Sequence, residues 1–444
     1  MKPKAPGDLV ETAELAAEKA KSLGASECAS KVYRRRSYKV VFRDGKWEEL
    51  SSSTQRKLSV RLFVDGKYAV HSTTDTSKKS IEPFVQRAVA LTRHLMEDKH
   101  RRLPPPELYK DRSKKDLGLY DPKYDNLDLA ARQAMAKKAY EEAKATAGEK
   151  LISASAGFSD SHVETVARHT NGFAENESET FYSSVATVSL QDEGGSRPSD
   201  WSVVGAHTLT ELPNPEKAGR EAARRAKAQL GAKKVDSMKI PIIVENRAVP
   251  RLLGGFLQPL AGSALYQGRS CFEKSLDRVI ASKMLSITDS PLLTKGFSSR
   301  RYDWEGITAR ELPIVEKGVL KSFYLDTYYA AKLGKKPTTG GRSNLVFSKG
   351  DKDLKGLCKD AGKALLITRF IGGNSNSTTG DFSHGVAGFL VENGEIGQPV
   401  IELNIAGNHT TQWRGLVGIG SDPFPYSSVL APSLLFAETT VAGK

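Results

Sequence analysis

The stretch Leu58-Ser59-Val60-Arg61-Leu62-Phe63-Val64-Asp65-Gly66-Lys67-Tyr68-Ala69-Val70 decides the fold of the N-terminal part of the chain. Apolar residues occupy every second position before Asp65-Gly66, and the alternation resumes after it. This pattern is typical of two half-buried strands joined by a tight turn. The same arrangement lies just upstream, where a strand pattern over Lys31–Phe42 precedes Asp44-Gly45 and a return strand over Glu48–Ser53. Two consecutive hairpins of this kind predict an antiparallel meander.

Helical patterns surround this meander. Apolar residues recur every three or four positions in each of them, and a glycine ends most of them. The predicted helices cover residues 8–23, 80–96, 127–147 and 216–230, and short strands are predicted over 152–158, 163–169, 179–191 and 201–209. Residues 103–121 contain three consecutive prolines, Pro104 to Pro106, which suit a stiff connector and exclude a helix interior.

The pattern changes after Ile240, where short strands and glycine-rich turns dominate and helices are predicted only over 248–263 and 327–333. Many short strands with such turns favour a barrel or a sandwich. The predicted fold class is therefore α+β, with a mixed helix and antiparallel-sheet N-terminal region followed by a β-rich, barrel- or sandwich-like C-terminal domain. We divide the chain into an N-terminal meander subdomain, a proline-rich connector, a second α+β subdomain and the β-rich domain, over residues 1–102, 103–125, 126–235 and 236–444.

The composition of the chain excludes several classes of protein. Its 444 residues are 39% hydrophobic and 27% charged, as in ordinary globular proteins. No apolar stretch reaches the roughly 20 residues that a membrane-spanning helix needs. Met1–Pro6 leads into a charged helical pattern, which is not a secretory signal. The three cysteines are odd in number and far apart, so we expect reduced thiols and a cytoplasmic protein.

The chain carries 66 basic and 52 acidic residues, a net charge of +14. Such an excess raises the question of a nucleic acid partner. The basic residues are spread along amphipathic stretches with acidic residues between them. The densest cluster, Arg34-Arg35-Arg36, lies in a strand pattern with only Tyr33 and Tyr38 as aromatic neighbours. We therefore favour the solvated faces of a basic protein over a nucleic acid site.

Motifs for metal or nucleophile chemistry are missing from the sequence. None of the eight histidines is followed by glutamate, as the common zinc-helix signatures require. His162 and His169 are an odd number of positions apart in a strand pattern, which directs them to opposite faces, and we expect surface polar residues there. The sequence contains neither a Gly-x-Ser-x-Gly motif nor a phosphate-binding loop. Cys271 has no histidine near it in the sequence and is expected to be an inert thiol.

The most informative stretch is Ile371–Asn408, in which glycine and small polar residues lie between two strand patterns. Such a composition allows another backbone to approach closely, as when an extended peptide lies against a sheet. It is also typical of an ordinary structural loop. Both interpretations stay open for Ser375–His384, whereas Asn393-Gly394 is expected to be a structural hairpin turn.

Several motifs of the chain resemble the PmbA/TldD family, whose members were once labelled modulators of DNA gyrase. The motifs are Phe42–Gly45, Val60–Phe63, Asp303–Ile307, Lys317–Leu320, Leu325–Gly334, Thr378–Ile396 and Asn404–Asn408, in the order of the family. The resemblance covers nearly the whole chain. It implies a mixed helix-and-strand N-terminal region before a β-rich C-terminal domain, in agreement with the residue patterns above.

The resemblance also implies a choice between two branches of the family. The TldD branch is similar to a zinc protease, with a His-Glu-x-x-x-His helix and a C-terminal cysteine as metal ligands. The equivalent helix of this chain lies in Val249–Leu260. Gly254 and Gly255 stand at the positions of the first histidine and the glutamate, and Pro259 stands at that of the second histidine.

The rest of the sequence offers no replacement for these ligands. No histidine lies between His207 and His384, and the segment Ser421–Pro432 contains no cysteine. Without the metal or a substitute for it, a domain of this kind cannot polarise a peptide carbonyl or generate a hydroxide at neutral pH. The chain therefore resembles the metal-free TldE/PmbA branch. No cofactor is expected in it, and zinc is expected only in a TldD-like partner.

We therefore expect a cytoplasmic pseudoenzyme without activity of its own. It would form a heterodimer with a TldD-like metalloprotease subunit and help to bind and process unfolded or extended peptides. The alternatives are a homodimeric peptide-binding protein, a hydrolase of unknown mechanism, and a DNA- or gyrase-associated modulator. The residues expected to face the peptide are Asn376, Thr378, Asp381, Ser383 and His384.

Overall fold

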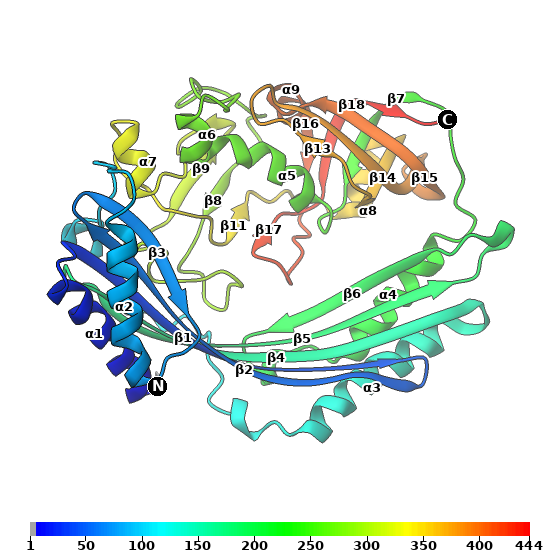
Figure 1. The fold of residues 1–444 in the computed structure, drawn as a ribbon. Coiled ribbons are helices and arrows are strands. Elements are labelled where there is room, and N and C mark those ends of the chain that lie inside the picture. The colour runs from blue at the N-terminus through cyan, green and yellow to red at the C-terminus, as the bar shows by residue number, and fades with distance from the viewer. Residues whose placement is uncertain (1–5) are drawn as a thin grey trace. The chain divides into compact units, whose positions relative to one another are not determined.

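The structure of the protein is a computed structural model, and it describes residues 6–444 (Figure 1). Met1–Ala5, which carry most of the charged start used to predict the absence of a secretory signal, lie outside the described residues. The chain forms two compact units. Unit 1 consists of Met1–Leu190, Asp200–Arg224 and Arg301–Ala309, and unit 2 consists of Gln191–Ser199, Arg225–Arg300 and Arg310–Lys444.

Unit 1 is built on a six-stranded sheet with the order β3-β2-β1-β4-β5-β6. Its strands are β1 (Glu27–Arg43), β2 (Lys46–Val64), β3 (Lys67–Thr73), β4 (Leu151–His169), β5 (Ala174–Leu190) and β6 (Ser199–Ala206). Both predicted turns join antiparallel strands, and Asp44 and Asp65 adopt the positive φ that such turns require. The predicted meander is confirmed, and the residues of the two predicted N-terminal subdomains share this one sheet.

Two strands of unit 1 are longer than predicted. Residues 48–53 and 58–64 belong to one strand, β2, and residues 152–158 and 163–169 both belong to β4. The stretch Ser51–Lys57 is polar and mostly exposed, yet its backbone pairs with β1 throughout. Hydrogen bonds of the ladder therefore extend the strand where the side-chain pattern reports no burial.

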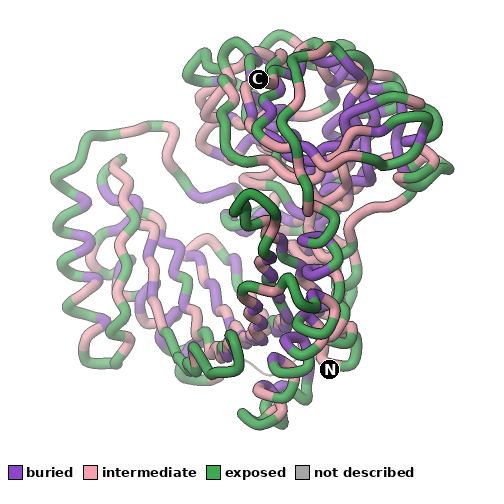
Figure 2. The backbone as a smooth tube through the Cα atoms, turned by 90° about the vertical axis from the view of Figure 1, so that its right-hand side faces the viewer, coloured by how far each residue is buried: buried purple, intermediate pink, exposed green. Residues whose placement is uncertain are grey.

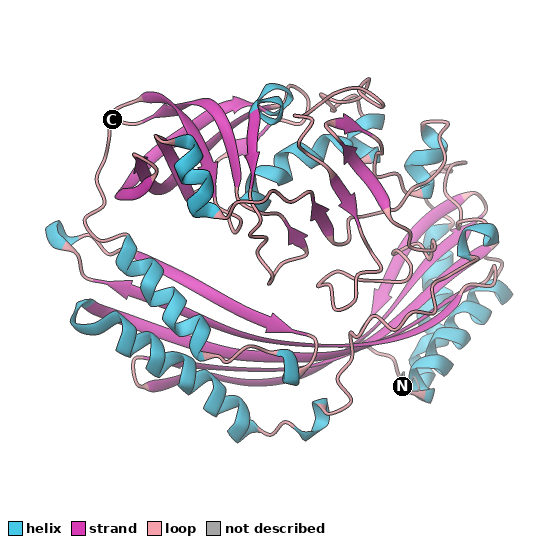
Figure 3. Ribbon diagram, turned by 180° about the vertical axis from the view of Figure 1, so that it is seen from behind, coloured by secondary structure: helices cyan, strands magenta, loops and turns pink. Residues whose placement is uncertain are grey.

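Helices cover one face of this sheet (Figure 3). They are α1 (Gly7–Ser22), α2 (Lys78–Thr92) and α3 (Leu129–Ala147), and α4 (Glu216–Ala228) packs against α3, where a Cβ atom on Gly219 would collide with the backbone of Ala139. The short turns of this part of the chain are η1 (Pro106–Tyr109), η2 (Tyr124–Asn126), η3 (Gly148–Lys150), η4 (Glu193–Gly195) and η5 (Leu209–Glu211). Val32 packs with α1, while Val40 and Phe158 pack with α3. Since these side chains share one face, buried and more exposed positions alternate along the long strands (Figure 2).

A buried ion pair fixes α3 on the sheet. Arg132 Nε donates to Asp160 Oδ2 at 2.6 Å, and Arg132 Nη2 donates to Asp160 Oδ1 at 3.0 Å. The ring of Tyr38 lies against the guanidinium group. Because an unpaired buried charge is costly, this bidentate pair specifies where the helix packs on β4.

Unit 2 contains a closed barrel of five strands. In ring order they are β7 (Met238–Val244), β18 (Leu434–Ala442), β15 (Glu395–Asn408), β14 (Asp381–Glu392) and β12 (Ala364–Phe370). The ring closes because β12 pairs with both β14 and β7. The short strands β13 (Asn374–Ser375) and β16 (Leu416–Ile419) extend it at β14 and β18.

A second sheet of unit 2 has the order β10-β9-β8-β11-β17. Its strands are β8 (Ile287–Asp289), β9 (Leu312–Glu316), β10 (Val319–Leu320), β11 (Leu345–Phe347) and β17 (Val429–Leu430). The helices are short: α5 (Val249–Leu257), η6 (Gln258–Leu260), α6 (Gly262–Tyr266), α7 (Thr327–Lys332), α8 (Leu354–Ala361), α9 (His409–Gln412) and η7 (Trp413–Gly415). The predicted α+β class with a barrel-like C-terminal domain is confirmed.

The helices of unit 2 differ from the prediction in two places. The helix predicted over 248–263 ends at Leu257, because Pro259 lacks the backbone donor that would continue it. Helix α8 was not predicted. Within residues 6–444, none of the helices combines the length and the apolar character needed to cross a membrane.

Barrel closure depends on Gly388, which lies opposite Ile367 where β14 pairs with β12. A Cβ atom at position 388 would collide with the carbonyl oxygen of Leu366, and this oxygen belongs to a paired strand. We expect Gly388→Ala to lower the free energy of unfolding by about 3 kcal/mol, measured by urea denaturation. Gly397→Ala on β15 is the matched control, since its Cβ would meet nothing closer than 3.5 Å. Equal stability of the two variants would contradict a steric role for Gly388 in barrel closure.

Candidate functional site

Three segments of unit 2 meet where β13 extends the barrel. Ser375 of β13 lies opposite Phe382 of β14. Because side chains alternate along a strand, Phe382 and His384 point to the same face of β14. Helix α9 begins with His409 directly after β15, and α5 approaches both segments with Gly255.

Ser375 lies between two imidazoles. Its Oγ is 3.4 Å from His384 Nε2 and 3.2 Å from His409 Nε2. Trp413 Nε1 donates to His409 Nδ1 at 3.2 Å, so His409 carries its proton on Nε2 and donates it to Ser375. His384 Nδ1 lies 3.3 Å from the carbonyl oxygen of Gly372, which can only accept. His384 Nε2 is therefore left to accept the hydroxyl proton of Ser375. The partners assign both tautomers and give one directed chain from Trp413 to Gly372.

Both imidazoles of this chain are buried and neutral. His384 is 2% exposed and His409 is 0% exposed. Burial lowers the pKa of His409 to about 4, with repulsion from His384 as the second cause. Burial also lowers the pKa of His384, where the carbonyl of Gly372 opposes the effect and the charge of Arg251 adds to it. The directed chain requires neutral rings, because each ring must offer one acceptor nitrogen.

One of the three helix positions identified in the sequence, Gly255, lies beside these hydrogen-bonded residues. A Cβ atom on Gly255 would collide with His409 Nε2 and Ser375 Oγ, whereas one on Gly254 would meet nothing within 4 Å. Pro259 is buried in the turn that follows α5. The space at position 255, where the resemblance places the glutamate of a zinc helix, is therefore filled by Ser375 and His409.

Three of the five residues predicted to face a peptide belong to β14, and they lie on its two faces. Ser383 and Asp381 lie on the outer face, where Asn404 Nδ2 donates to Ser383 Oγ at 3.1 Å and Asn408 Nδ2 donates to Asp381 Oδ1 at 2.8 Å. His384 lies on the inner face with Ser375 and His409. The structure thus brings Asp381 and Ser383 together and separates them from His384.

Asn376 and Thr378 belong to the exposed turn that precedes β14. Asn376 Oδ1 accepts from the backbone nitrogen of Thr378 at 2.9 Å, and Gly380 donates its backbone N–H to the carbonyl of Asn376 at 2.8 Å. Thr379 Oγ1 donates to Asp381 at 2.7 Å. This bond, with a second one from Asn408, holds the pKa of Asp381 below its usual value. The turn is ordered by its own polar groups, and its side chains remain at the surface.

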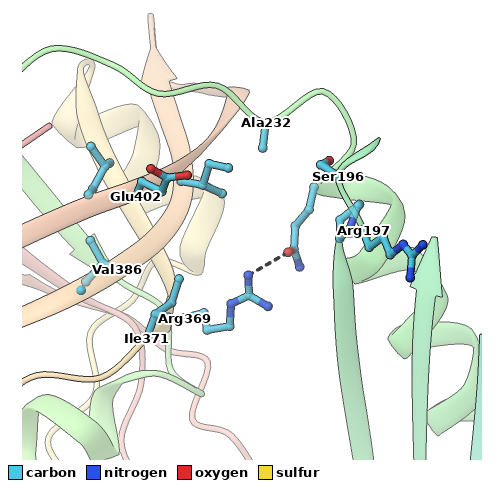
Figure 4. Close-up of a pocket in the computed structure, with 12 residues that line it drawn as sticks. Ser196, Arg197, Ala232, Arg369, Ile371, Val386 and Glu402 are labelled. Carbon is cyan, nitrogen blue, oxygen red and sulfur yellow. Dashed lines mark hydrogen bonds between the residues drawn. The ribbon is translucent and has the colours of Figure 1, made fainter. Parts of the chain in front are cut away.

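A cavity of about 370 Å³ adjoins the outer face of β14 (Figure 4). It is lined by Gly385, by apolar side chains such as Ile371, and by Arg369. Arg369 Nη1 donates to the carbonyl of Ser199 at 2.9 Å, and Nη2 donates to Gln229 Oε1 at 3.1 Å. The guanidinium group of Arg369 beside an apolar lining suits a ligand that has both polar and apolar surface.

Burial raises the pKa of all three thiols of the chain. Burial raises the pKa of Cys28 to about 12 and those of Cys271 and Cys358 to about 11. A thiol with such a pKa stays protonated at neutral pH, and the thiolate is the nucleophilic form. This agrees with the inert thiol expected at Cys271.

His162 and His169 are buried, and the expectation of surface residues is wrong. The reason is that aromatic residues of the proline-rich connector cover them. Tyr109 OH lies 3.2 Å from His169 Nδ1, and the rings of Tyr120 and Tyr124 lie 5.2 Å and 5.3 Å from that of His162. Among residues 6–444 no group of three or more His, Cys, Asp or Glu side chains is arranged to hold a metal ion.

Ion pairs neutralise part of the densest basic cluster. Arg34 lies 2.7 Å from Glu164, and Arg36 lies 2.7 Å from Asp125. Two of the three arginines therefore have carboxylate partners within unit 1. This arrangement agrees with the interpretation of the cluster as part of a basic protein surface.

The protein is of the α+β class, and its C-terminal barrel carries a polar site. At this site α5 packs against the hydrogen-bonded residues next to β13. The sequence matches three domains described for PmbA/TldA metallopeptidases: domain 1 over residues 31–92, the central domain over 122–230 and the C-terminal domain over 237–443. The chain belongs to the PmbA/TldD family, as its sequence motifs indicated.

Similar proteins extend over almost the full chain. Metalloprotease PmbA from Escherichia coli O157:H7 is 30% identical over 412 residues, which are 91% of this chain and 90% of that protein. A crystal structure from Bacteroides thetaiotaomicron, of a protein described as a candidate modulator of DNA gyrase, has 36% identity and a TM-score of 0.96, covering 99% of this chain and 100% of that one. TldE from Thermococcus kodakarensis has 17% identity and a TM-score of 0.84 over 97% of this chain and 100% of that one, which shows the shared fold.

The sequence did not identify the partners of His384. Ser375 was included only as the start of a loop with two interpretations, and His409 was not predicted at all. A signal was present at Gly255, since glycine inside a helix often marks a close approach. The sequence does not show which residue makes that approach.

The adjacent glycines of α5 give a matched pair of variants. We expect Gly255→Ala to destabilise the protein by roughly 1–3 kcal/mol, because the new methyl group must displace the buried ring of His409. Gly254→Ala should be neutral or stabilising by up to about 1 kcal/mol, because alanine favours a helix and the space there is open. Denaturant unfolding of both proteins measures the difference.

A double variant tests the cause of this difference. In a His409→Ala background, the cost of Gly255→Ala should shrink, because the cavity left by the ring accepts the methyl group. Equal effects at positions 254 and 255, or strictly additive effects of Gly255→Ala and His409→Ala, would contradict this account.

Proposed function

We propose that this chain is the metal-free, TldE-like subunit of a TldD/TldE-type zinc metalloprotease complex. A TldD-like subunit would perform hydrolysis, and this chain would help to bind unfolded or extended peptides. The observation that carries the proposal is the filled space at Gly255, where Ser375 and His409 leave no room for a glutamate. Gly254 and Pro259 supply no ligand atoms. A zinc-activated water needs both a ligand set and a general base, and these positions provide neither.

Support for peptide binding comes from the outer face of β14 and β15. The pairs Ser383–Asn404 and Asp381–Asn408 place amide, hydroxyl and carboxylate groups along this exposed face. An extended peptide lying over the face would find donors and acceptors at the spacing of a sheet. The neighbouring cavity beside Arg369 gives room for one of its side chains. Under this proposal the exposed turn with Asn376 and Thr378 forms the rim of the peptide site.

The proposal places the complex in the cytoplasm. The three cysteines Cys28, Cys271 and Cys358 are free thiols, which suits a reducing compartment. The partner would be a TldD-like subunit that binds zinc, and this chain would need no cofactor of its own. The alternative is a homodimer of this chain that acts as a peptide-binding protein. Light scattering distinguishes this homodimer from a heterodimer with a TldD-like subunit.

Reconstitution tests the proposed role. We expect an unstructured protein such as casein to be cleaved by a mixture of this chain and a TldD-like protein from the same genome, and by neither protein alone. The mixture should form one complex in light scattering, and a zinc chelator should abolish cleavage. Elemental analysis should find zinc in the TldD-like subunit and none at stoichiometric level in this chain, since its helix positions lack ligand atoms.

Two sets of variants refine this test. Glutamine in place of the motif glutamate of the TldD-like subunit should preserve the complex and abolish cleavage. In this chain, Asp381→Ala combined with Ser383→Ala should weaken peptide cleavage with the complex intact, whereas Gly254→Ala should leave cleavage unchanged. Full activity of the TldD-like protein alone, or chelator-sensitive cleavage by this chain alone, would overturn the proposal.

A further inference from the structure

The directed chain around Ser375 contains groups that a peptide-binding role does not need. The hydroxyl proton of Ser375 points to the acceptor nitrogen of a neutral imidazole, His384 Nε2. The other nitrogen of this ring is held by the carbonyl of Gly372. A hydroxyl bonded to a base that is oriented by a third group is the arrangement of an activated nucleophile.

We propose that Ser375 is a nucleophile, with His384 as its general base, and that it accepts acyl groups from small activated esters. This activity would belong to the isolated chain and would need neither zinc nor a partner subunit. His409 is a positioning residue in this scheme, because its Nε2–H donates to Ser375 Oγ and leaves the hydroxyl proton directed at His384.

The segment that carries Ser375 is partly exposed. Ser375 is half-buried, and the preceding residues Gly372, Gly373 and Asn374 are exposed. Arg251 is exposed as well, and its Nη2 donates to the carbonyl of Gly373 at 2.7 Å. The guanidinium group thus lies beside Gly373, two residues before Ser375 in the sequence.

The distances in the chain are long for strong hydrogen bonds, at 3.4 Å to His384 and 3.2 Å to His409. Catalytic hydrogen bonds are often long before substrate binds and shorten in the complex. Because both rings are buried, they cannot rotate freely to shorten these two hydrogen bonds. Under this proposal Ser375, which lies at the end of a two-residue strand, moves toward His384 when substrate binds.

The proposed reaction has two balanced steps. Ser375 Oγ forms a bond to the carbonyl carbon of the ester while its proton passes to His384 Nε2, and the carbonyl π electrons move to oxygen. The carbonyl then re-forms, the bond to the alcohol breaks, and the alcohol oxygen takes the proton from His384. Water attacks the acyl-serine in the same way, with His384 as base, and releases the carboxylic acid and Ser375.

An alkyl fluorophosphonate tests the nucleophile directly. Ser375 Oγ would form a bond to phosphorus, fluoride would leave with the electron pair of the P–F bond, and the proton would pass to His384. We expect one phosphonyl group per chain, in the presence of a zinc chelator, and peptide mass spectrometry should locate it on Ser375. Hydrolysis of p-nitrophenyl acetate by the same preparation should stop when the label is in place.

Variants separate the roles in this test. Ser375→Ala should abolish labelling, and His384→Asn should lower its rate by about 100-fold, the usual effect of losing a general base. The matched control is Ser377→Ala, which removes a hydroxyl two positions away in the same loop and should label at the original rate. Circular dichroism of each variant establishes that it is folded.

Three outcomes would overturn the proposal: an unlabelled wild-type chain, a label on another residue, or a folded His384→Asn variant that reacts at the original rate. The first two need no variant, so a Ser375→Ala protein that fails to fold does not weaken the test. Because the experiment uses the isolated chain without zinc, its failure is distinguishable from failure of the proposed subunit role. That role is tested by zinc-dependent cleavage in the complex.

Discussion

The absence of space at position 255 is the constraint on which the site depends. Helix α5 can lie against β13 and α9 only if it presents a residue without a side chain, because Ser375 and His409 occupy the volume where a Cβ atom would lie. Close contact at a glycine brings three chain segments together that are distant in sequence. It also decides the chemistry, since the same volume cannot hold both a carboxylate from the helix and the hydrogen-bonded chain from Trp413 to Gly372.

Much of the fold could be predicted from local sequence patterns. The Asp44-Gly45 and Asp65-Gly66 turns were predictable because positive φ at an aspartate–glycine pair is a local property. The continuity of β2 was not, because Ser51–Lys57 is held by backbone pairing with β1 and buries little apolar surface. Closure of the barrel was also beyond local pattern, since it depends on β12 pairing with two strands far away in the sequence.

The candidate site was predictable only in part, for a similar reason. Composition identified the segment that contains Ser375 and His384, and the family resemblance predicted that Gly254, Gly255 and Pro259 stand at the positions of a zinc helix. Neither could show that the segment and the helix touch each other. His409 follows a recognised motif but has no local feature that marks it as a partner of Ser375. Its role arises from the Trp413 indole, which fixes its tautomer through a contact one helical turn away.

The hydrogen bonds between Trp413, His409, Ser375, His384 and Gly372 make burial of the two imidazoles possible. Two buried histidines would be costly if they were charged or unpaired. Here each ring nitrogen has a partner, and both pKa values are lowered, so the rings stay neutral. Each of these residues is a hydrogen-bond partner of the next, so removal of one side chain leaves another without a partner. A glutamate at position 255 would therefore require simultaneous replacement of Ser375 and His409, and a single substitution cannot convert one arrangement into the other. A glutamate side chain at position 255 and the hydrogen-bonded residues Ser375 and His409 cannot occupy the same volume. Displacement of either residue would also break the hydrogen bond between them.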